Sequence, residues 1–561
     1  MNKHKMLPIG IENFEEMVTK NFWYADKTLM IKDLLDGDVK VQLITRPRRF
    51  GKTLNMSMLQ HFFDCTMDSR ALFKDLAIGK AGDEYLAHMN QYPVIFLTFK
   101  RAKKLTFEEA IEVLLDELGR EFRRHQYLAN SDKVDSYFRK VMASYFSPTA
   151  KKLKPEASLH LLCEALHKHW GKKAIILLDE YDVPLESSYS ANEPYYNKMI
   201  SFFRRMMGDA LKGNSSLEFG VVTGCLRISK ESIFTGLNNL EVNTILDNGF
   251  SRYFGITEDE MAEAIEEFGL EQYREGIQKW YNGYIFGQTN VYNPWSVINY
   301  IKSSVYDNQP DFVSFWANTS GNDIVKKLWV QAGNIERDQI ETLLQGGVIT
   351  KKIHTEVTFQ ELYNTVENIW NLLFFTGYLK KADTAPVQAD GITHLIIPNE
   401  EVKYIYLNTI TSWFDNNLKE SKHSAFIKAL LESDTKMMAI EINRVLLKTI
   451  SFMDKAENFY HGFLTGLLAS MGDDYSVKSN RETGNGRSDI MVYSTLDKSF
   501  AAILELKTAP DLLHLSAACD AALTQISEKN YAAELHNLLF TDIHKFGIAF
   551  CGKECAVKMA E

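Results

Sequence analysis

Short strand-like runs rich in apolar residues mark the first half of the chain. Residues 41–45 form one such run, and residues 174–178 form a second in which all five side chains are apolar. A third run, residues 219–223, follows a stretch with helical periodicity. Runs of this length are typical of strands buried on both faces, as in a parallel sheet covered by helices. The pattern therefore predicts an α/β fold for this part of the chain.

The apolar positions recur with the period of a helix from about residue 250 to residue 440. The clearest segments are residues 261–268, 361–378 and 402–414. Thr257, followed by three acidic residues, predicts a helix N-cap with a favourable first turn. We therefore expect a helical middle region that acts as a lid, with its tryptophans and tyrosines in the core.

Over the last hundred or so residues, the pattern of apolar positions alternates between that of helices and that of strands. Alternating or continuous apolar runs predict strands, and a glycine-rich turn separates the first two of them. The predicted order is αβββαβ, with the elements at residues 457–471, 475–482, 487–494, 500–507, 511–531 and 546–550.

The first predicted strand leads into a basic loop, residues 46–53, with the sequence RPRRFGKT. A strand, a loop ending in Gly-Lys-Thr and a following helix are the layout of a nucleotide phosphate loop, in which backbone N–H groups and the lysine bind phosphates and the hydroxyl holds Mg²⁺. The pattern normally begins with glycine, whereas Arg46 stands there. The expected nucleotide-binding residues of the loop are Arg49, Gly51, Lys52 and Thr53, with Thr53 also a metal ligand.

Polar residues end the other two predicted strands. Asp179 and Glu180 follow the second strand, at the edge where open α/β sheets bind ligands. We expect Asp179 to bind nucleotide and Mg²⁺, and Glu180 to orient or deprotonate the attacking water as a catalytic residue. Thr223 ends the third strand and is placed to sense the γ-phosphate, with Arg227 just beyond it.

Each of these features also has a purely structural interpretation. Gly-Lys-Thr is common in exposed turns, and the Asp-Glu-Tyr-Asp sequence after the second strand could be a solvated acidic turn. Arg204 and Arg205 are candidate arginine fingers, but a solvated helix face explains them as well.

A second candidate site lies near the C-terminal end of the chain. Asp489 falls on the second strand of the αβββαβ segment, and Glu505 and Lys507 fall on one face of the third strand because strand side chains alternate. Two carboxylates on adjoining strands suit Mg²⁺, and a lysine beside them can position or activate a water that attacks a phosphodiester. We expect Glu457, with His461 one helical turn on, to complete the metal site.

Further residues around this site are weaker candidates. Gln525 and Tyr531, both predicted on the following helix, could contact DNA or order the site. Lys478, Arg481 and Arg487 suit a phosphate backbone. The alternative is that all of these residues form only the polar side of an amphipathic sheet.

The net charge, the cysteines and the apolar runs of the chain limit the classes of function that it can have. The 561 residues carry a net charge of −10, which argues against a protein that coats nucleic acid generally but allows a local basic groove. Six scattered cysteines without paired metal-ligand spacing indicate reduced thiols. We find no signal-peptide pattern and no apolar run near the roughly 20 residues needed to span a bilayer. We therefore expect a cytoplasmic protein without a membrane partner.

The longer motifs resemble known families. The bacterial AAA-ATPase-like proteins are similar in the segments at residues 22–28, 46–53, 178–182, 232–239, 280–284 and 292–296. Residues 480–489, followed by Glu505-Leu506-Lys507, resemble the PD-(D/E)xK nuclease-superfamily domain that ends those proteins. The arginine at the start of the phosphate loop fits the family pattern. The spacing from Gln525 to Tyr531 is longer than the usual four residues of this nuclease type.

The resemblance implies three parts: an AAA-ATPase-like P-loop domain at residues 1–250, a helical lid or middle region at 251–440, and a PD-(D/E)xK nuclease-like domain at 441–561. The two phosphate-chemistry sites together lead us to expect a protein that binds and hydrolyses ATP and acts on nucleic acid, with DNA favoured over RNA and Mg²⁺ or Mn²⁺ as the metal. One alternative is a nucleotide-driven switch or scaffold whose C-terminal domain binds nucleic acid without cleaving it. Another is a nuclease that binds ATP without hydrolysing it. Self-association is left open.

Overall fold

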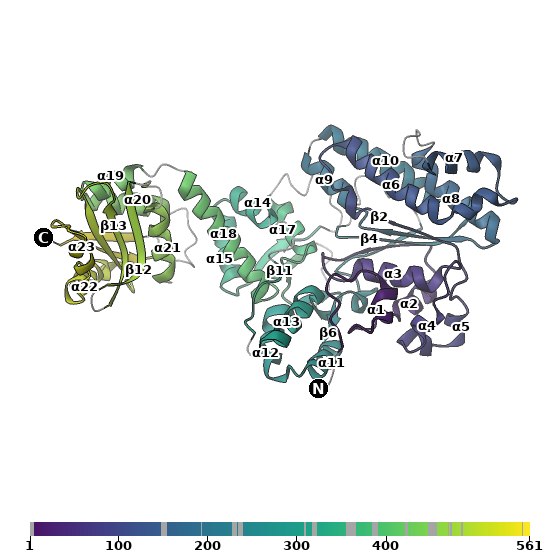
Figure 1. The fold of residues 1–561 in the computed structure, drawn as a ribbon, viewed down its shortest axis with the longest axis horizontal. Helices are drawn as coiled ribbons and strands as arrows, with labels where there is room; N and C mark the ends of the chain where they lie inside the picture. The colour runs from purple at the N-terminus through teal and green to yellow at the C-terminus, as the bar shows by residue number, and fades with distance from the viewer. Residues whose placement is uncertain are drawn as a thin grey trace. The chain divides into compact units, whose positions relative to one another are not determined.

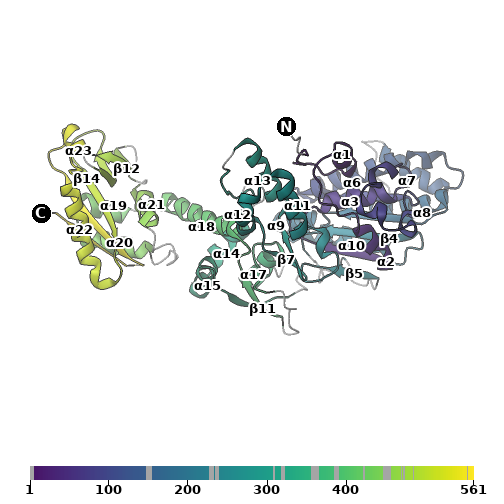
Figure 2. The ribbon, with the colours of Figure 1, turned by 90° about the horizontal axis from the view of Figure 1, so that it is seen from below.

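The computed structural model describes residues 5–146, 154–191, 193–226, 233, 239–307, 310–316, 323–354, 366–383, 391–420, 424–446, 457–468, 471, 474–483, 486–552 and 554–560. The chain divides into two compact units. The first comprises Met1–Ile324 and Val348–Ile405, and the second comprises Val325–Gly347 and Tyr406–Glu561. Figure 1 and Figure 2 show the elements of each unit.

A five-stranded sheet forms the centre of the first unit. Its order is β2-β3-β4-β1-β5, and every neighbouring pair is parallel. The strands are β1 Val41–Thr45, β2 Val94–Thr98, β3 Ala174–Asp179, β4 Leu217–Gly224 and β5 Leu240–Asn243. The predicted parallel α/β sheet is confirmed, although the apolar runs predicted only β1, β3 and β4.

Helices cover both faces of this sheet, so that β1 and β3 are buried along their whole length. In Figure 1, α1, α2 and α3 lie on one side, and α6, α8 and α10 lie on the other. The bounds are α1 Phe14–Thr19, α2 Met30–Asp36, α3 Lys52–Phe63, α4 Arg70–Phe73, α5 Asp83–Leu86, α6 Phe107–Arg124, α7 Ser136–Phe146, α8 Ser158–Trp170, α9 Val183–Ala191 and α10 Glu193–Leu211.

The middle of the chain is helical, as predicted, but two small antiparallel sheets accompany the helices. One has the order β6-β8-β7 and the other β10-β11-β9. The elements are β6 Ile256–Thr257, α11 Glu258–Phe268, α12 Arg274–Tyr281, β7 Tyr284–Phe286, β8 Thr289–Tyr292, α13 Pro294–Tyr306, α14 Asp323–Gln331, α15 Asn334–Leu344, β9 Ile349–Lys352, α17 Val366–Phe375, β10 Lys380–Lys381, β11 Ile392–Ile396 and α18 Glu400–Glu420.

The predicted N-cap of α11 is confirmed. The Thr257 side chain accepts from the Glu260 N–H, and the Glu260 carboxylate accepts from the Thr257 N–H at 2.8 Å, which completes a capping box. The same carboxylate pairs with the buried ammonium of Lys27 at 2.5 Å. Lys27 belongs to the N-terminal family-like motif, so that motif ties the start of the chain to α11.

The second unit contains a mixed five-stranded sheet with the order β12-β13-β14-β15-β16. Only β14 and β15 pair in parallel. The elements are α19 Ser424–Leu431, α20 Thr435–Leu446, α21 Glu457–Leu468, β12 Tyr475–Thr483, β13 Gly486–Ser494, β14 Ala501–Thr508, α22 Leu515–Glu528, α23 Ala533–Asn537, β15 His544–Cys551 and β16 Glu554–Met559.

The predicted αβββαβ order runs from α21 to β15, and β16 extends it by an antiparallel edge strand. The prediction that one helix contains both Gln525 and Tyr531 was wrong. Helix α22 ends at Glu528, and Asn530 adopts a left-handed backbone with φ of 53°, which turns the chain before Tyr531. Among the described residues, no helix is long and apolar enough to cross a membrane.

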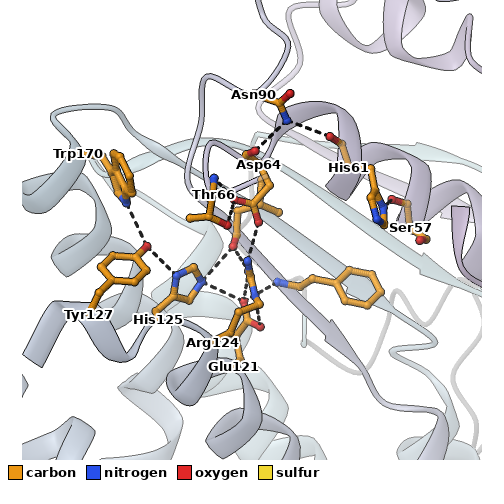
Figure 3. A network of polar contacts seen from close by, with 12 residues as sticks. Ser57, His61, Asp64, Thr66, Asn90, Glu121, Arg124, His125, Tyr127 and Trp170 are labelled. Carbon is orange, nitrogen blue, oxygen red and sulfur yellow. Dashed lines mark hydrogen bonds and ion pairs between the residues drawn. The ribbon is translucent and has the colours of Figure 1, made fainter. Parts of the chain in front are cut away.

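A buried network of charges holds the edge strand β2 against α6 (Figure 3). Arg124 pairs with Asp64 at 2.5 Å and with Glu121 at 2.6 Å. Glu121 also accepts the Phe96 N–H of β2 at 3.0 Å and lies 3.3 Å from His125. Burial acts to raise the pKa of Glu121, but Arg124 and His125 outweigh it and lower that pKa to about 2. The network therefore satisfies an edge-strand N–H that no neighbouring strand could reach.

We predict that this network makes folding sensitive to acid. The pKa of Glu121 is lowered from 4.5 to about 2, so its stabilisation is complete above pH 4.5 and is lost as the pH falls towards 2. Glu121→Gln should lose on the order of 3 kcal/mol of unfolding free energy at pH 7, and the deficit should shrink below pH 4.5. Calorimetric melting of the whole chain across this range measures both effects.

The control for this experiment is Glu117→Gln on the same helix. Glu117 pairs with the exposed Arg101 at 3.0 Å, a contact worth about 0–1 kcal/mol. Equal losses for the two variants, or a Glu121→Gln deficit that does not depend on pH, would contradict the prediction.

Candidate nucleotide and nuclease sites

The loop between β1 and α3 has the backbone of a phosphate-binding turn. Arg49 and Gly51 have φ values of 73° and 81°, in the left-handed region. A Cβ built on Gly51 would meet no atom within 4 Å, so glycine is needed here for its backbone conformation and leaves the surface open. The N-terminus of α3 follows at once, and its free N–H groups favour an anion.

Arg46, at the position where the loop pattern usually has glycine, is fully buried. Its guanidinium donates to the carbonyl oxygens of Thr45 at 2.8 Å, Asn243 at 2.9 Å and Gly249 at 2.9 Å. It also lies 5.2 Å from the ring centre of Phe286. Arg46 therefore joins the base of the loop to the end of β5 and to the segment beyond it, a structural role that sequence reasoning missed.

Lys52, the lysine of the loop, is buried and points back into the loop. Its ammonium donates to the carbonyl oxygens of Arg46 and Pro47, both at 3.1 Å, and lies 3.8 Å from a Glu180 carboxylate oxygen. Burial acts to lower the pKa of Lys52, but Cys225 and the nearby carboxylates raise it. Lys52 is therefore a cation held in one position at the N-terminus of α3.

The first turn of α3 and the ends of β3 and β4 bring Thr53, Asp179 and Thr223 together. The Thr53 hydroxyl donates to Asp179 Oδ2 at 2.8 Å, and the Thr223 hydroxyl donates to Asp179 Oδ1 at 2.6 Å. Asp179 is fully buried, and burial, followed by the charge of Glu180, raises its pKa. A hydroxyl and a carboxylate oxygen in contact are the hard ligands that Mg²⁺ prefers, so these residues fit a nucleotide-bound Mg²⁺.

The two acidic residues after Asp179 differ in their surroundings. Glu180 has a left-handed backbone with φ of 56°, an unfavourable conformation that is often found at functional sites. Asp182 is buried and accepts the N–H groups of Cys225 at 2.7 Å and Leu226 at 2.9 Å. Burial and then Glu180 raise the pKa of Asp182 to about 7. Asp182, which sequence reasoning did not single out, positions the chain just after β4.

The predicted arginines lie in different surroundings, and one of them lies outside the described residues. Arg49 in the loop stacks on Trp295, with its guanidinium carbon 4.0 Å from the ring centre. Arg205 pairs with Glu156 at 3.1 Å on the exposed side of α10, in keeping with the solvated-face interpretation. Arg204 lies beside it on the same helix. Arg227 lies outside the described residues, as does most of the family-like segment at 232–239.

The second unit places Asp489, Glu505 and Lys507 side by side on β13 and β14. The Asp489 N–H donates to Glu505 Oε2 at 3.4 Å, and Asp489 Oδ2 accepts the Leu506 N–H at 2.8 Å. The Lys507 ammonium lies 3.7 Å from Glu505 Oε1. Glu505 is only 1% exposed. Two carboxylates and a lysine thus lie together on two adjoining inner strands of the sheet, and the carboxylate oxygen atoms suit a divalent cation.

Gln525 and Tyr531 meet at this site even though they are not on one helix. The Gln525 side-chain amide donates to Glu505 Oε1 and, at 3.1 Å, to the Tyr531 hydroxyl. The turn after α22 therefore compensates for a spacing longer than the usual four residues. Gln525 therefore holds Glu505 directly, and Tyr531 contacts Gln525.

The remaining candidates are only partly described. Helix α21 begins at Glu457, but the side chains of Glu457, Arg481 and Arg487 lie outside what the structure describes. His461 donates from Nε2 to the backbone oxygen of Asp489 at 2.8 Å, and so supports the strand there. Lys478 pairs with Glu534 at 3.3 Å. Within the described parts of the chain, no group of three or more His, Cys, Asp or Glu side chains could hold a metal ion.

The matches to known families agree with the placement of the two candidate sites in different parts of the chain. Residues 8–234 match the family described as "Predicted AAA-ATPase", and residues 455–560 match the PD-(D/E)XK nuclease superfamily. The chain thus combines an AAA-ATPase-like part with a PD-(D/E)XK nuclease-superfamily part, as the resemblance predicted. At the level of families, these matches support ATPase and nuclease-like chemistry in general.

One relative extends the similarity beyond either family match. It is an uncharacterized protein in the vnfD 5' region of Azotobacter chroococcum mcd 1, which is 24% identical over 402 residues. The aligned part covers 71% of this chain and 68% of the relative. The aligned length therefore exceeds that of either family match.

We predict that Arg46 is needed for the stability of the loop. Arg46→Gly, which introduces the usual first residue of the loop, should cost roughly 3 kcal/mol, because three buried carbonyl groups lose a charged donor and glycine adds unfolded-state entropy. Calorimetric melting of the whole chain measures the loss. Arg48→Gly is the control, because Arg48 makes a half-exposed ion pair with Glu186. A melting point for Arg46→Gly at or above that of the control would contradict the prediction.

Proposed function

We propose that this chain binds ATP with Mg²⁺ and hydrolyses it, and that its C-terminal unit cleaves DNA with a divalent metal. The observation that carries the first part is the contact of Thr53 and Thr223 with the buried Asp179, next to Lys52. In this proposal the ammonium of Lys52 and the N-terminus of α3 bind the phosphates, and Thr53 and Asp179 hold the cation. Bound Mg²⁺ supplies charge neutralisation on the phosphate oxygens.

Glu180 is the proposed catalytic residue of the ATPase. It directly follows the residue that holds the cation, and its carboxylate is 3.8 Å from Lys52. Its task is to orient the attacking water and to accept its proton. Thr223 is proposed to contact the γ-phosphate, since its hydroxyl is at the end of the central strand β4. The left-handed backbone of Glu180 supports a functional rather than a structural role, because such strain persists where it is useful.

The nuclease proposal rests on the shared position of Asp489, Glu505 and Lys507. The two carboxylates would hold the metal, and a bound metal would supply activation of water and stabilisation of charge on the phosphodiester. Lys507 would position the attacking water. Gln525 keeps the Glu505 side chain oriented through its amide. Mg²⁺ is the expected metal and Mn²⁺ an alternative, since both prefer oxygen ligands.

One observation favours the alternative of a nucleotide-driven switch whose C-terminal unit binds without cleaving. Glu505 is 1% exposed and is already held by Gln525 and Lys507, so a metal would have to compete with both donors. A DNA-cleavage assay separates the two functions, because both predict ATP binding and only one predicts product.

We predict separate losses in the ATPase. Lys52→Ala should reduce ATP binding below detection, because it removes the cation of the loop. Glu180→Gln should keep ATP binding and slow phosphate release by about 100-fold or more. Binding calorimetry and a phosphate-release assay distinguish these effects. Glu193→Gln, at the exposed start of α10, is the control. Normal phosphate release by Glu180→Gln would exclude Glu180 as the catalytic residue.

We predict the reverse separation in the second unit. Asp489→Asn and Glu505→Gln should abolish cleavage of plasmid and linear DNA in Mg²⁺ or Mn²⁺, and both should bind ATP as the parent does. Asp520→Asn, which removes a surface ion pair on α22, should cleave normally. If the parent cleaves no DNA with or without ATP, the switch becomes the better account; if Asp489→Asn still cleaves, the assigned site is wrong.

A further inference from the structure

Three segments of the middle region contact the phosphate loop in the first unit. The guanidinium carbon of Arg49 lies 4.0 Å from the ring centre of Trp295. The ring of Phe50 lies edge-on to that of Tyr284, with 4.9 Å between the ring centres. Gly377 packs against the proline of the loop, since a Cβ built on it would lie 3.3 Å from two carbons of that ring. The conformation of the loop therefore depends on where these three segments lie.

The carboxylate of Glu401, in the first turn of α18, is fully buried and belongs to neither candidate site. Its Oε1 accepts the N–H groups of Phe315 and Trp316, both at 2.9 Å, and the Ser296 hydroxyl lies 2.9 and 2.8 Å from its two oxygens. Burial raises the pKa of Glu401 to about 7, although these donors act to lower it. A buried carboxylate is costly without such donors, so Glu401 and its three partners hold one another in place.

The first connection from Glu401 to the loop runs through α13. Ser296, which donates to Glu401, directly follows Trp295, which stacks on Arg49. The indole N–H of Trp295 also donates to the backbone oxygen of Phe315 at 3.3 Å. Glu401 therefore holds Trp295 from two directions, through its neighbour in α13 and through residue 315.

The second connection runs through the ring of Trp316, whose N–H donates to Glu401. This ring stacks on Tyr378, the residue after the glycine that packs on the loop, with 4.9 Å between the ring centres. It also lies edge-on to Tyr284 at 6.2 Å. All three segments that contact the loop are thus connected to one carboxylate.

We propose that Glu401 is a positioning residue for the ATP site, so that ATP on the loop and the first turn of α18 stabilise each other. The inference rests on the proposed ATP binding and adds a group that acts from outside the site. Close-packed rings and buried hydrogen bonds transmit displacement, and coupling between two sites is reciprocal. The boundary between the two units falls within α18, after Ile405, so the helix that begins at this carboxylate belongs to both units.

The test compares two changes at one position. Glu401→Ala removes the acceptor, whereas Glu401→Gln keeps an oxygen that can accept the N–H groups of Phe315 and Trp316. Glu400→Ala is the matched control, because Glu400 is the preceding residue, is partly exposed and lies 4.0 Å from Lys279. Calorimetry measures binding of ATP with Mg²⁺ to the full chain, and melting points show whether each variant is folded. Hydrogen exchange of the two amides, with and without ATP, measures the coupling in the parent.

We expect Glu401→Ala to bind ATP roughly tenfold more weakly, and Glu401→Gln and Glu400→Ala to bind it as the parent does. ATP should slow exchange of the Phe315 and Trp316 amides in the parent. Trp295→Leu should weaken ATP binding in the parent and have a smaller effect in the Glu401→Ala background, because both changes act on the loop through the same contact.

Unchanged ATP affinity in folded Glu401→Ala would overturn the proposal, as would equal weakening by Glu400→Ala or additive effects of Trp295→Leu and Glu401→Ala. If Glu401→Ala does not fold, the parent still decides: exchange of the two amides that ATP does not change would overturn the proposal. If the parent binds no ATP, the proposed ATP function itself fails, whereas ATP binding without these couplings removes only the role of Glu401.

Discussion

The fully buried carboxylate of Asp179 constrains the ATPase-like unit more than any other group. A carboxylate in such a place is costly unless hydrogen bonds satisfy it. Its two closest hydroxyl partners, Thr53 and Thr223, are far from it in sequence and reach it because β4 lies between β1 and β3 in the sheet. The hydrogen bonds of this carboxylate therefore depend on both the strand order and the position of the loop. A cation bound at this point would take the place of hydroxyl hydrogens, which can rotate away from the carboxylate.

The second unit meets the same electrostatic problem differently. Glu505 is held by an amide and an ammonium, and Asp489 by a backbone N–H. These hydrogen-bond donors stabilise the negative charges of the two carboxylates, as a bound metal would. The two sites would therefore differ in how easily they bind a metal. At Asp179 the metal would displace hydroxyl groups at little cost. At Glu505 it would displace an ammonium group, which requires that the metal gain further ligands. This difference is why the ATPase assignment rests on firmer chemistry than cleavage does.

The sequence predicted those elements whose pattern is local and strong. The buried runs of β1, β3 and β4 could be recognised, whereas β2, half-exposed at two positions along an edge, and the short edge strand β16 could not. The small sheets of the middle region were overlooked because strands of two to five residues carry little periodic signal. Tyr531 was assigned to α22 because Asn530 was interpreted as part of the helix, although asparagine commonly ends helices in the left-handed conformation that it adopts here.

Among the site residues, local motifs predicted which side chains are present but not what holds them. Lys52, Thr53 and Asp179 could be named from the loop and the strand end. The burial of Arg46 could not, because its partners Asn243 and Gly249 lie about 200 positions away and an arginine is normally exposed. The same holds for Gln525 and Tyr531, which meet through a turn that sequence spacing does not reveal.

The contacts of Lys52 have a consequence for which anions the loop admits. Its ammonium is already satisfied by two carbonyl oxygens, so an incoming anion exchanges partners rather than supplying missing ones. The net gain is the difference between a phosphate oxygen and a carbonyl dipole, and it is positive only for a ligand with concentrated charge. The buried ammonium therefore favours an anion whose charge exceeds the two carbonyl dipoles that it would replace.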